Sequence, residues 1–258
     1  MANGQWLKAE KKTMAQAMKG YKARGVVLST VKYGDSGMVV QMLTDRYGRQ
    51  SYMVQGVRSS RGKGSKMALF QPLFLLQFEG LESPHSDLHK MREVQNDVVF
   101  RSLPYDVRKS TIALFMAEVL YRLVGESEAN EPLFDFVHSS VRALDEIDEG
   151  VANFHLWFLS NLSRYLGYFP GNEHQKGCWF DMREGLYVTD MPLHNHTMSV
   201  EEAELLRDLT ETDLECLGEI PLNREQRVAM LSRLVDYYSI HLEAIRSVRS
   251  IEILQEVF

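Results

Sequence analysis

The sequence has 258 residues, of which 45% are hydrophobic and 25% are charged, as is typical of a globular protein. No apolar run reaches the roughly 18 residues that a membrane-spanning helix needs, and the basic N-terminus lacks the apolar stretch of a secretory signal. Two cysteines, Cys178 and Cys216, are too few for a disulfide framework or a zinc quartet. We therefore expect a cytoplasmic protein with no membrane partner.

Charge is distributed unevenly along the chain, although the net charge is only −6. Residues 1–80 contain 13 Lys and Arg against four acidic residues, a balance of +9. Residues 81–258 contain 16 basic and 31 acidic residues, a balance of −15. A polyanion would be attracted to the first part and repelled by the second, which indicates two parts with different electrostatic roles.

The first hundred residues show the period-two pattern of β-strands, after an N-terminal extension over 1–20. Pro72 indicates that its strand lies at an edge or begins after the proline. The last segment fits a strand with a bulge or a short helix. Five strands joined by short turns predict a small barrel, either an OB-fold or an SH3-like barrel. The five segments are Gly25–Lys32, Met38–Thr44, Arg49–Val57, Leu69–Glu79 and Leu88–Gln95.

After Leu103 and Pro104 the apolar period changes to that of helices. A helix with apolar positions from Ile112 to Val124 is expected to end at Gly125 as its C-cap. Strands followed by helices predict an α+β fold, with a barrel domain over 21–98 and a helical domain over 99–258. Residues 167–198 look irregular. The other helices are expected from Pro132 to Leu144 or Ile147, over Val151–Leu166, from Ser199 to about Leu209, over Asp213–Leu217, from Asn223 to about Ile245, and over Ile251–Phe258.

The segment Gly56–Lys66 places four basic residues among glycines and serines, between two expected strands. Arg and Lys neutralise phosphates, and glycine lets backbone N–H groups approach them, so such a loop can follow a nucleic-acid backbone. Its spacing does not match a Walker A loop, and a solvated surface turn is the alternative interpretation. The candidate DNA contacts are Arg58, Arg61, Lys63 and Lys66, extended by Lys32, Arg46 and Arg49 from neighbouring turns; Tyr33, Tyr47 and Tyr52 could stack bases or pack within the barrel.

Residues of metal-ligating types gather in the irregular segment, but their spacing is poor, with one cysteine and no C-x-x-C pair. No motif of a hydrolase, a zinc protease or another common catalyst is present. We therefore predict no metal, no cofactor and no enzymatic activity. A metal-dependent enzyme is the third hypothesis, and residual metal affinity stays open. The residues in question are His174, Cys178, Asp181, Asp190, His194 and His196.

Seven segments, in the same order along the chain, resemble those of the RecO family of bacterial recombination mediators. They include the basic segment and the Arg164–Pro170 stretch, RYLGYFP, which resembles the family's LGY.P motif ahead of its zinc region. Many members carry four cysteines after that motif, whereas only Cys178 stands here. The resemblance is therefore to members that have lost the metal, with a degenerate zinc-ribbon-like insertion. The other five segments are Lys22–Leu28, Thr44–Arg49, Leu69–Leu73, Leu103–Arg122 and Asn130–Phe134.

The resemblance implies an OB-fold barrel and a mediator of recombinational repair. Such proteins bind single-stranded and double-stranded DNA, anneal complementary strands, bind the acidic C-terminal tail of single-stranded DNA-binding protein, and join RecR to help load RecA. Nucleoid association would follow. Arg122 and Arg164 are candidates for contact with the acidic tail. The alternative is an adaptor whose barrel grips an acidic peptide without touching DNA.

Overall fold

A computed structural model describes residues 20–57, 66–83, 86–126 and 129–258. The chain divides into two compact units. The first contains the residues up to Val99 together with Gly125–Phe134, and the second contains Phe100–Val124 and Asp135–Phe258. In the part of the chain described, no helix has the length and apolar character required to cross a bilayer. The domain boundary near residue 98 stays a prediction.

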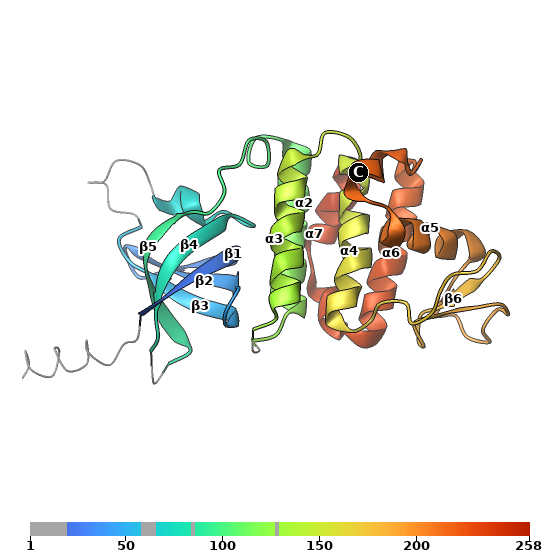
Figure 1. Ribbon diagram of the computed structural model, residues 1–258, viewed down its shortest axis with the longest axis horizontal. Helices are drawn as coiled ribbons and strands as arrows, with labels where there is room; N and C mark the ends of the chain where they lie inside the picture. The colour runs from blue at the N-terminus through green and yellow to red at the C-terminus, as the bar shows by residue number, and fades with distance from the viewer. Residues whose placement is uncertain (1–19, 58–65, 84–85, 127–128) are drawn as a thin grey trace, which may run out of the picture. The chain divides into compact units, whose positions relative to one another are not determined.

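The first unit is a closed barrel of five strands in the order β1-β2-β3-β5-β4 (Figure 1). Neighbouring strands are antiparallel except β3 and β5, whose short parallel pairing joins Ser51–Met53 to Leu88–Lys90. This is the five-stranded barrel of the OB-fold, so the predicted fold class is confirmed. The elements are β1 (Gly20–Tyr33), β2 (Gly37–Thr44), β3 (Gly48–Val54), the 3-10 helix η1 (Lys66–Phe70), β4 (Leu75–Leu81) and β5 (Leu88–Asn96).

Local signals in the sequence explain two irregular points of the barrel. Strand β4 begins at Leu75, which agrees with the prediction that the strand starts after Pro72. The last strand carries a bulge, because Gln95 pairs with Gln77 while Arg92 pairs with Glu79. Glu93, inside the bulge, has a φ of 53°, an uncommon conformation for a residue with a side chain.

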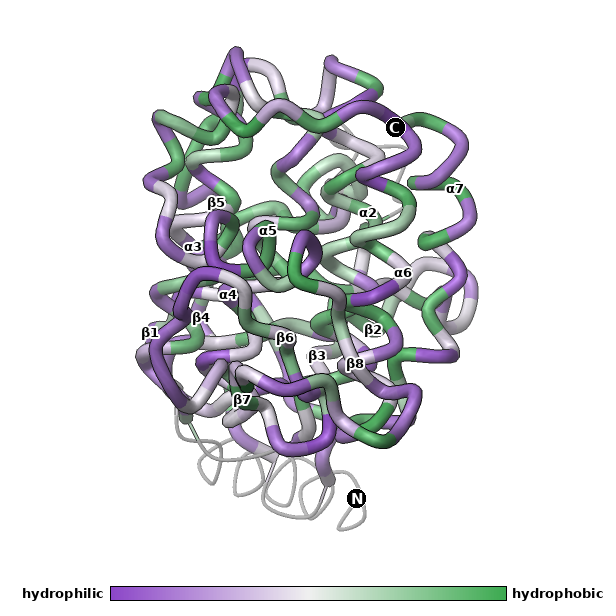
Figure 2. The backbone as a smooth tube through the Cα atoms, turned by 90° about the vertical axis from the view of Figure 1, so that its right-hand side faces the viewer, coloured by the Kyte–Doolittle hydropathy of each residue, from purple (hydrophilic) through white to green (hydrophobic). Residues whose placement is uncertain are grey.

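The second unit contains the helices, which carry hydrophobic and hydrophilic residues in alternation along their length (Figure 2). Helix α4 packs against α2, α5 and α6, and α2 packs against α7. Phe136 of α3 stacks on Phe158 and Tyr165 of α4, with ring centroids 5.5 and 4.6 Å apart. The elements are α2 (Val107–Leu123), α3 (Glu131–Glu146), η2 (Val151–Asn153), α4 (Phe154–Leu166), α5 (Val200–Glu211), η3 (Leu214–Glu219), α6 (Arg224–His241), η4 (Glu243–Ser247) and α7 (Ser250–Val257).

The segment 167–198 contains a small sheet in the order β7-β6-β8, formed by β6 (Trp179–Asp181), β7 (Leu186–Val188) and β8 (Thr197–Met198). Phe180 of β6 and Met198 of β8 are fully buried. Gly171 N–H donates to the carbonyl of Gly185, and Asn172 bonds the backbone of Tyr187, so the loop before β6 is tied to the β6–β7 turn. The segment is therefore a packed insertion, more regular than its glycines and prolines suggested.

Two predicted helix ends are wrong. Helix α2 ends at Leu123, and its C-cap is Val124 in an extended conformation (φ −87°, ψ 114°), not Gly125. Helix α6 ends at His241 instead of near Ile245, because Leu242 (φ −137°, ψ 88°) leaves the helical region and the chain continues in η4. Ile245 stays buried in that 3-10 turn, which explains why the apolar period ran past the end of the helix.

Candidate nucleic-acid interface

The basic segment begins and ends on fixed points of the barrel, although Arg58, Arg61 and Lys63 lie outside the described residues. Val57, the second residue of the segment Gly56–Lys66, is buried in the barrel core and donates its N–H to the carbonyl of Ser36 over 3.1 Å. Phe70 follows the segment at the end of η1 and packs in the same core. Lys66 is the first residue of η1. The segment therefore departs from the barrel beside the turn that joins β1 to β2.

The β1–β2 hairpin is exposed at that same end of the barrel. Thr30 to Tyr33 are all exposed, and the side chains of Val31 and Tyr33 keep 61% and 57% of their surface in solvent. Gly34, with a φ of 61°, makes the turn in the left-handed region that favours glycine. Because side chains alternate along a strand, Val31 and Tyr33 share one face and Lys32 lies on the other. We call Thr30–Ser36 and Val57 the hairpin end of the barrel.

Arg46 and Arg49 lie at the opposite end of β2. Lys32 pairs with Met38, at the beginning of β2, whereas Thr44, at its end, pairs with Gly48. From Met38 to Thr44 the strand advances by six residue steps, about 20 Å at 3.3 Å per residue. Lys32 therefore lies near Val57, at the start of the basic segment, whereas Arg46 and Arg49 lie at the far end of β2 from that point.

The two arginines also differ in accessibility. Arg46 is exposed in the β2–β3 turn. The Arg49 side chain is only 16% exposed, and its guanidinium lies 3.6 Å from the Glu126 carboxylate, within the first unit. A phosphate would have to compete with that carboxylate, so Arg49 is less available than the sequence suggested.

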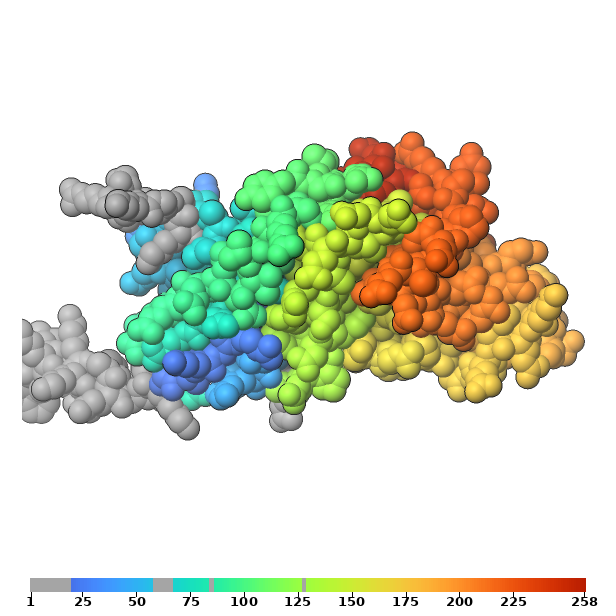
Figure 3. Space-filling model, turned by 45° about the horizontal axis from the view of Figure 1, so that its top comes forward, coloured from blue at the N-terminus to red at the C-terminus, as the bar shows by residue number. Residues whose placement is uncertain are grey.

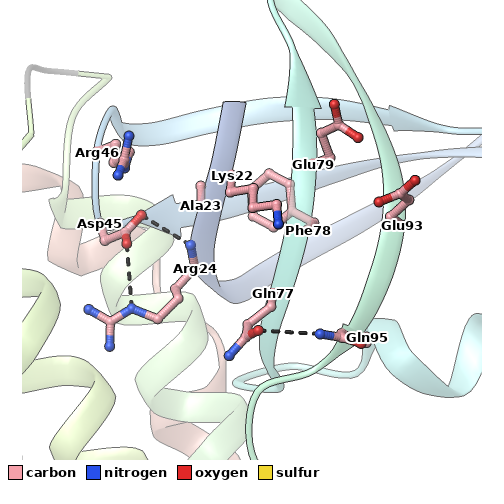
Figure 4. A pocket seen from close by; sticks show the side chains of 10 residues that line it. All are labelled: Lys22, Ala23, Arg24, Asp45, Arg46, Gln77, Phe78, Glu79, Glu93 and Gln95. Carbon is pink, nitrogen blue, oxygen red and sulfur yellow. Dashed lines mark hydrogen bonds and ion pairs between the residues drawn. The ribbon is translucent and has the colours of Figure 1, made fainter. Parts of the chain in front are cut away.

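A groove of about 330 Å³ opens on the barrel beside Arg46 (Figure 4). Its charges are mixed. The Asp45 carboxylate accepts from the backbone and side-chain nitrogens of Arg24, over 3.1 and 3.4 Å. The Glu79 carboxylate is paired with Arg92 at 2.7 and 2.8 Å. The other lining residues are Lys22, Ala23, Gln77, Phe78, Glu93 and Gln95. Sequence reasoning missed this groove, although Lys22 and Arg24 alternate on β1 as residues of one face do.

Only one of the three candidate stacking tyrosines is exposed. Tyr52 is fully buried, with its hydroxyl 2.9 Å from that of Tyr21 and its ring edge-on to Phe78. Burial, first, and then the bond to Tyr21 raise the pKa of Tyr52. Tyr47 is half-buried, and its ring centroid lies 4.5 Å from that of Tyr21. Tyr52 is therefore a core residue, and Tyr33 is the tyrosine free to stack a base.

In the helical unit, one of the two candidate arginines lines a cavity. The Arg164 guanidinium lies 3.7 Å from the ring centroid of Phe169, at a cavity of about 320 Å³ that His174, Tyr187 and Arg207 also line. Arg122 is exposed on the last turn of α2, with its guanidinium 5.7 Å from the ring centroid of Tyr121. The two arginines lie at the ends of different helices and form no common site.

The histidines of the insertion are engaged with neighbouring residues. His194 Nε2 lies 3.3 Å from the Asp181 carboxylate, which also accepts from the N–H groups of Arg183 and Glu184. His174 meets the ring of Tyr187 edge-on. Over the described ranges, no three His, Cys, Asp or Glu side chains come together in the manner of metal ligands.

Comparison with known proteins covers nearly all of the chain. Two family models match, Recombination protein O N terminal over residues 18–96 and Recombination protein O C terminal over residues 104–249. The DNA repair protein RecO of Phocaeicola vulgatus is 39% identical over 92% of this chain and 98% of its own length. The proteins of that name from Bacteroides fragilis and Flavobacterium psychrophilum are 37% and 34% identical, over the same shares of both chains. This chain therefore belongs to the RecO family of DNA repair proteins.

Proposed function

We propose that this DNA repair protein is a recombination mediator that binds single-stranded DNA at the hairpin end of its barrel. The observation that carries the proposal is the juxtaposition of an exposed Lys32 and Tyr33 with the point, at Val57, where the basic segment leaves the barrel. Proteins that bind single strands combine a cationic surface with aromatic rings on which bases stack. Both components are available at this end, where a strand that crosses the β1–β2 turn would meet Tyr33 on one face of β1 and Lys32 on the other.

Binding would be electrostatic in origin. Lys32 and the segment's Arg58, Arg61, Lys63 and Lys66 would displace counterions from the phosphates, while Tyr33 stacks a base. Annealing then requires only that two strands be held together with part of their charge neutralised, so no covalent step and no cofactor is involved. Duplex DNA presents the same phosphates and would bind through the same charges. Arg46 and Arg49, at the other end of β2, would contribute at most a secondary contact.

The protein partners we propose are RecR and the acidic tail of single-stranded DNA-binding protein, through which the protein would help RecA to load in the nucleoid. The cavity at Arg164 fits an acidic tail better than the surface at Arg122. It offers a cation stacked on an aromatic ring, with the hollow beside it, although Glu173 and Glu211 also line that hollow. Arg122 is exposed on the last turn of α2 and does not line that cavity.

The test is charge reversal in the basic segment. The variant with Arg58, Arg61, Lys63 and Lys66 all changed to Glu should lose binding to a labelled single-stranded oligonucleotide at low salt. The matched control reverses four exposed basic residues of the helical unit, Lys176, Arg183, Arg246 and Arg142, and should bind as the wild type does. If the two variants lose affinity equally, the loss reflects net charge, and the site assignment is wrong.

The adaptor hypothesis predicts a different result in the same apparatus. A labelled acidic-tail peptide would bind to the wild-type protein, and the oligonucleotide would bind at no salt concentration. If both ligands bind, competition between them shows whether they share the barrel. The proposed function requires that peptide binding survive in the basic-segment variant and weaken when Arg164 is changed to Glu.

A further inference from the structure

A groove of about 310 Å³ lies on the helical unit between α5 and the chain that leads from η3 into α6. Residues of this region, orange in Figure 3, form part of the molecular surface. The floor is apolar: Leu205, Ile220 and Leu222 are half-buried, and Met230 is buried at the bottom. The remaining lining residues are Glu201, Glu202, Glu204, Asp208, Pro221, Gln226 and Ala229.

One wall of the groove is acidic because of helical periodicity. Glu201, Glu204, Leu205 and Asp208 recur at spacings of three and four along α5, so they share one face. Three carboxylates thus surround one leucine. The Glu201 carboxylate accepts a hydrogen bond from the Ser199 hydroxyl. Among the described residues, no basic side chain forms an ion pair with Glu204. The wall is acidic and solvated.

The cations near the groove are already engaged. Arg207 Nε lies 3.0 Å from the Asp208 carboxylate, and Arg233 Nε lies 2.9 Å from that of Glu202. Arg224 donates to the carbonyls of Gln255 and Glu256. Residues 200–225 contain nine acidic residues and two basic ones. The negative charge around the groove is therefore not neutralised from within this stretch.

The size of the groove limits what it can hold. At about 310 Å³ it lies near the lower end of the range for ligand pockets, roughly 300 to 1,000 Å³. That volume suits one or two large apolar side chains. A partner must therefore supply an apolar anchor, with positive charge beside it to match the wall of α5.

We propose that this groove docks a basic segment of a partner protein, which inserts one or two large apolar side chains over Leu205 and Met230 while its Lys or Arg residues face Glu201 and Glu204. The charge of the wall argues against DNA and against an acidic tail as occupants. The groove would thus bind a positively charged partner, whereas the partners in the proposed function, DNA and an acidic tail, are negatively charged. This inference therefore does not depend on the proposed function.

The probe is a short fluorescein-labelled peptide with leucines at helical spacing among lysines. A second peptide replaces the leucines with alanines, and a third replaces the lysines with glutamates. Anisotropy measured with the full-length protein at about 50 mM salt should show binding of the first peptide at least about fivefold tighter than of either other. If the alanine peptide binds equally well, the attraction is charge alone and the groove proposal is overturned.

Location is tested with two variants of equal charge change. Glu201→Lys with Glu204→Lys alters the wall, whereas Glu184→Lys with Glu243→Lys alters two exposed residues elsewhere in the unit. The wall variant should lose about fivefold in affinity and the control should retain it. Equal losses would overturn the proposal. Thermal unfolding checks the fold, and if the wall variant is unfolded, Glu201→Gln with Glu204→Gln takes its place.

A photoreactive group in place of the central leucine checks the contact directly. Cross-links should map to Leu205, Leu222 or Met230, and cross-links confined to other residues would contradict the proposal. Sedimentation without peptide tests a second copy of the chain as occupant. If the wild type and the control variant self-associate and the wall variant does not, the occupant of the groove is a second copy of this chain. That result would overturn the proposal of a partner protein.

Discussion

His155 is a buried titratable group with a structural role. It lies in the core of the helical unit, where its ring meets Phe115 edge-on at 6.5 Å and lies 5.5 Å from the ring of Phe258. Its Nδ1 has no hydrogen-bond partner among the described residues. Burial, reinforced by the nearby positive charge of Arg227, lowers the pKa of His155 to about 3. The histidine is therefore neutral in the folded protein at ordinary pH.

This lowered pKa predicts a specific loss of stability in mild acid. Below pH 6.5 the unfolded chain takes up a proton at His155, and the folded protein does not until about pH 3. The free energy of unfolding should therefore fall by about 1.4 kcal/mol per pH unit as the pH drops between these values. Urea unfolding at pH 7 and pH 5 should show a drop of about 2 kcal/mol that His155→Leu lacks.

Exposed His196 provides the control for that measurement. His196→Gln should keep the full pH dependence of the wild type. A His155→Leu variant as pH-dependent as the wild type would mean that His155 is not the group responsible.

Asp145 holds the turn from which the helical unit begins. Its carboxylate accepts from the backbone N–H groups of Arg101, Ser102 and Leu103, and its carbonyl accepts from the buried Lys109 ammonium. Burial alone would raise the pKa of Asp145, but these N–H bonds outweigh it and lower the pKa. This contribution to stability is fully present above the unfolded pKa, near 3.9, and is lost as the pH falls through the lower folded value.

Asp145→Ala should therefore destabilise the protein by about 3 kcal/mol, because it leaves three N–H donors unsatisfied. The midpoint of urea unfolding at pH 7 measures this. Exposed Asp148, three residues away, is the control, and Asp148→Ala should cost less than about 0.5 kcal/mol. Similar losses in both variants would show that the carboxylate does not act through these bonds.

Elements whose signals are local could be predicted well. The helices expected from Ser199 and Asn223 begin there, each at a capping box, Ser199 with Glu202 and Asn223 with Gln226. The predicted helix ends at Gly125 and near Ile245 were wrong, because the position of each end depends on the direction that the following segment takes in the fold. A local sequence pattern does not encode that direction. The same holds for Tyr52. Its strand was predicted from the sequence, but the burial of its ring follows from the closure of the barrel.

The capping box of α5 gives a test at this scale. Ser199→Ala removes the acceptor for the Glu202 N–H and should cost about 1 kcal/mol of stability. Ser232 bonds only the Val228 carbonyl within exposed α6 surface, so Ser232→Ala should be close to neutral. Urea unfolding compares the two variants, and the prediction fails if their midpoints shift together.

The β1–β2 hairpin carries a prediction about binding. Tyr33→Ala should weaken single-strand binding by about 1 to 3 kcal/mol, roughly 5-fold to 150-fold, because a stacking ring is lost. Unfolding should be unchanged, since the side chain is exposed. Tyr105→Ala is the matched control, because that tyrosine is 80% exposed in the helical unit. An oligonucleotide affinity equal in both variants would remove Tyr33 from the interface.

At the scale of the whole molecule, the uneven charge along the sequence does not by itself tell where each cation lies in the fold. Lys32 and the basic segment were grouped because they are close in the sequence's turn pattern, and the structure brings Lys32 close to Val57, where that segment starts. Arg46 and Arg49 were added by the same reasoning, yet the length of β2 sets them about 20 Å away. The acidic groove on α5 was missed because its floor comes from α5, the chain between η3 and α6, and α6 together.

The salt dependence of binding tests how many cations act together. Each phosphate neutralised on a single strand contributes about −0.7 to the slope of log affinity against log salt. Five cations, Lys32 with Arg58, Arg61, Lys63 and Lys66, predict a slope of about −3.5, and changing the last four to Gln should leave about −0.7. If Arg46 and Arg49 belonged to the same interface, the wild-type slope would be about −4.9, and changing these two arginines to Gln would bring it to about −3.5. Because they lie at the far end of β2, we expect a short oligonucleotide to show no such change, while a longer one that reaches both ends of the strand shows it.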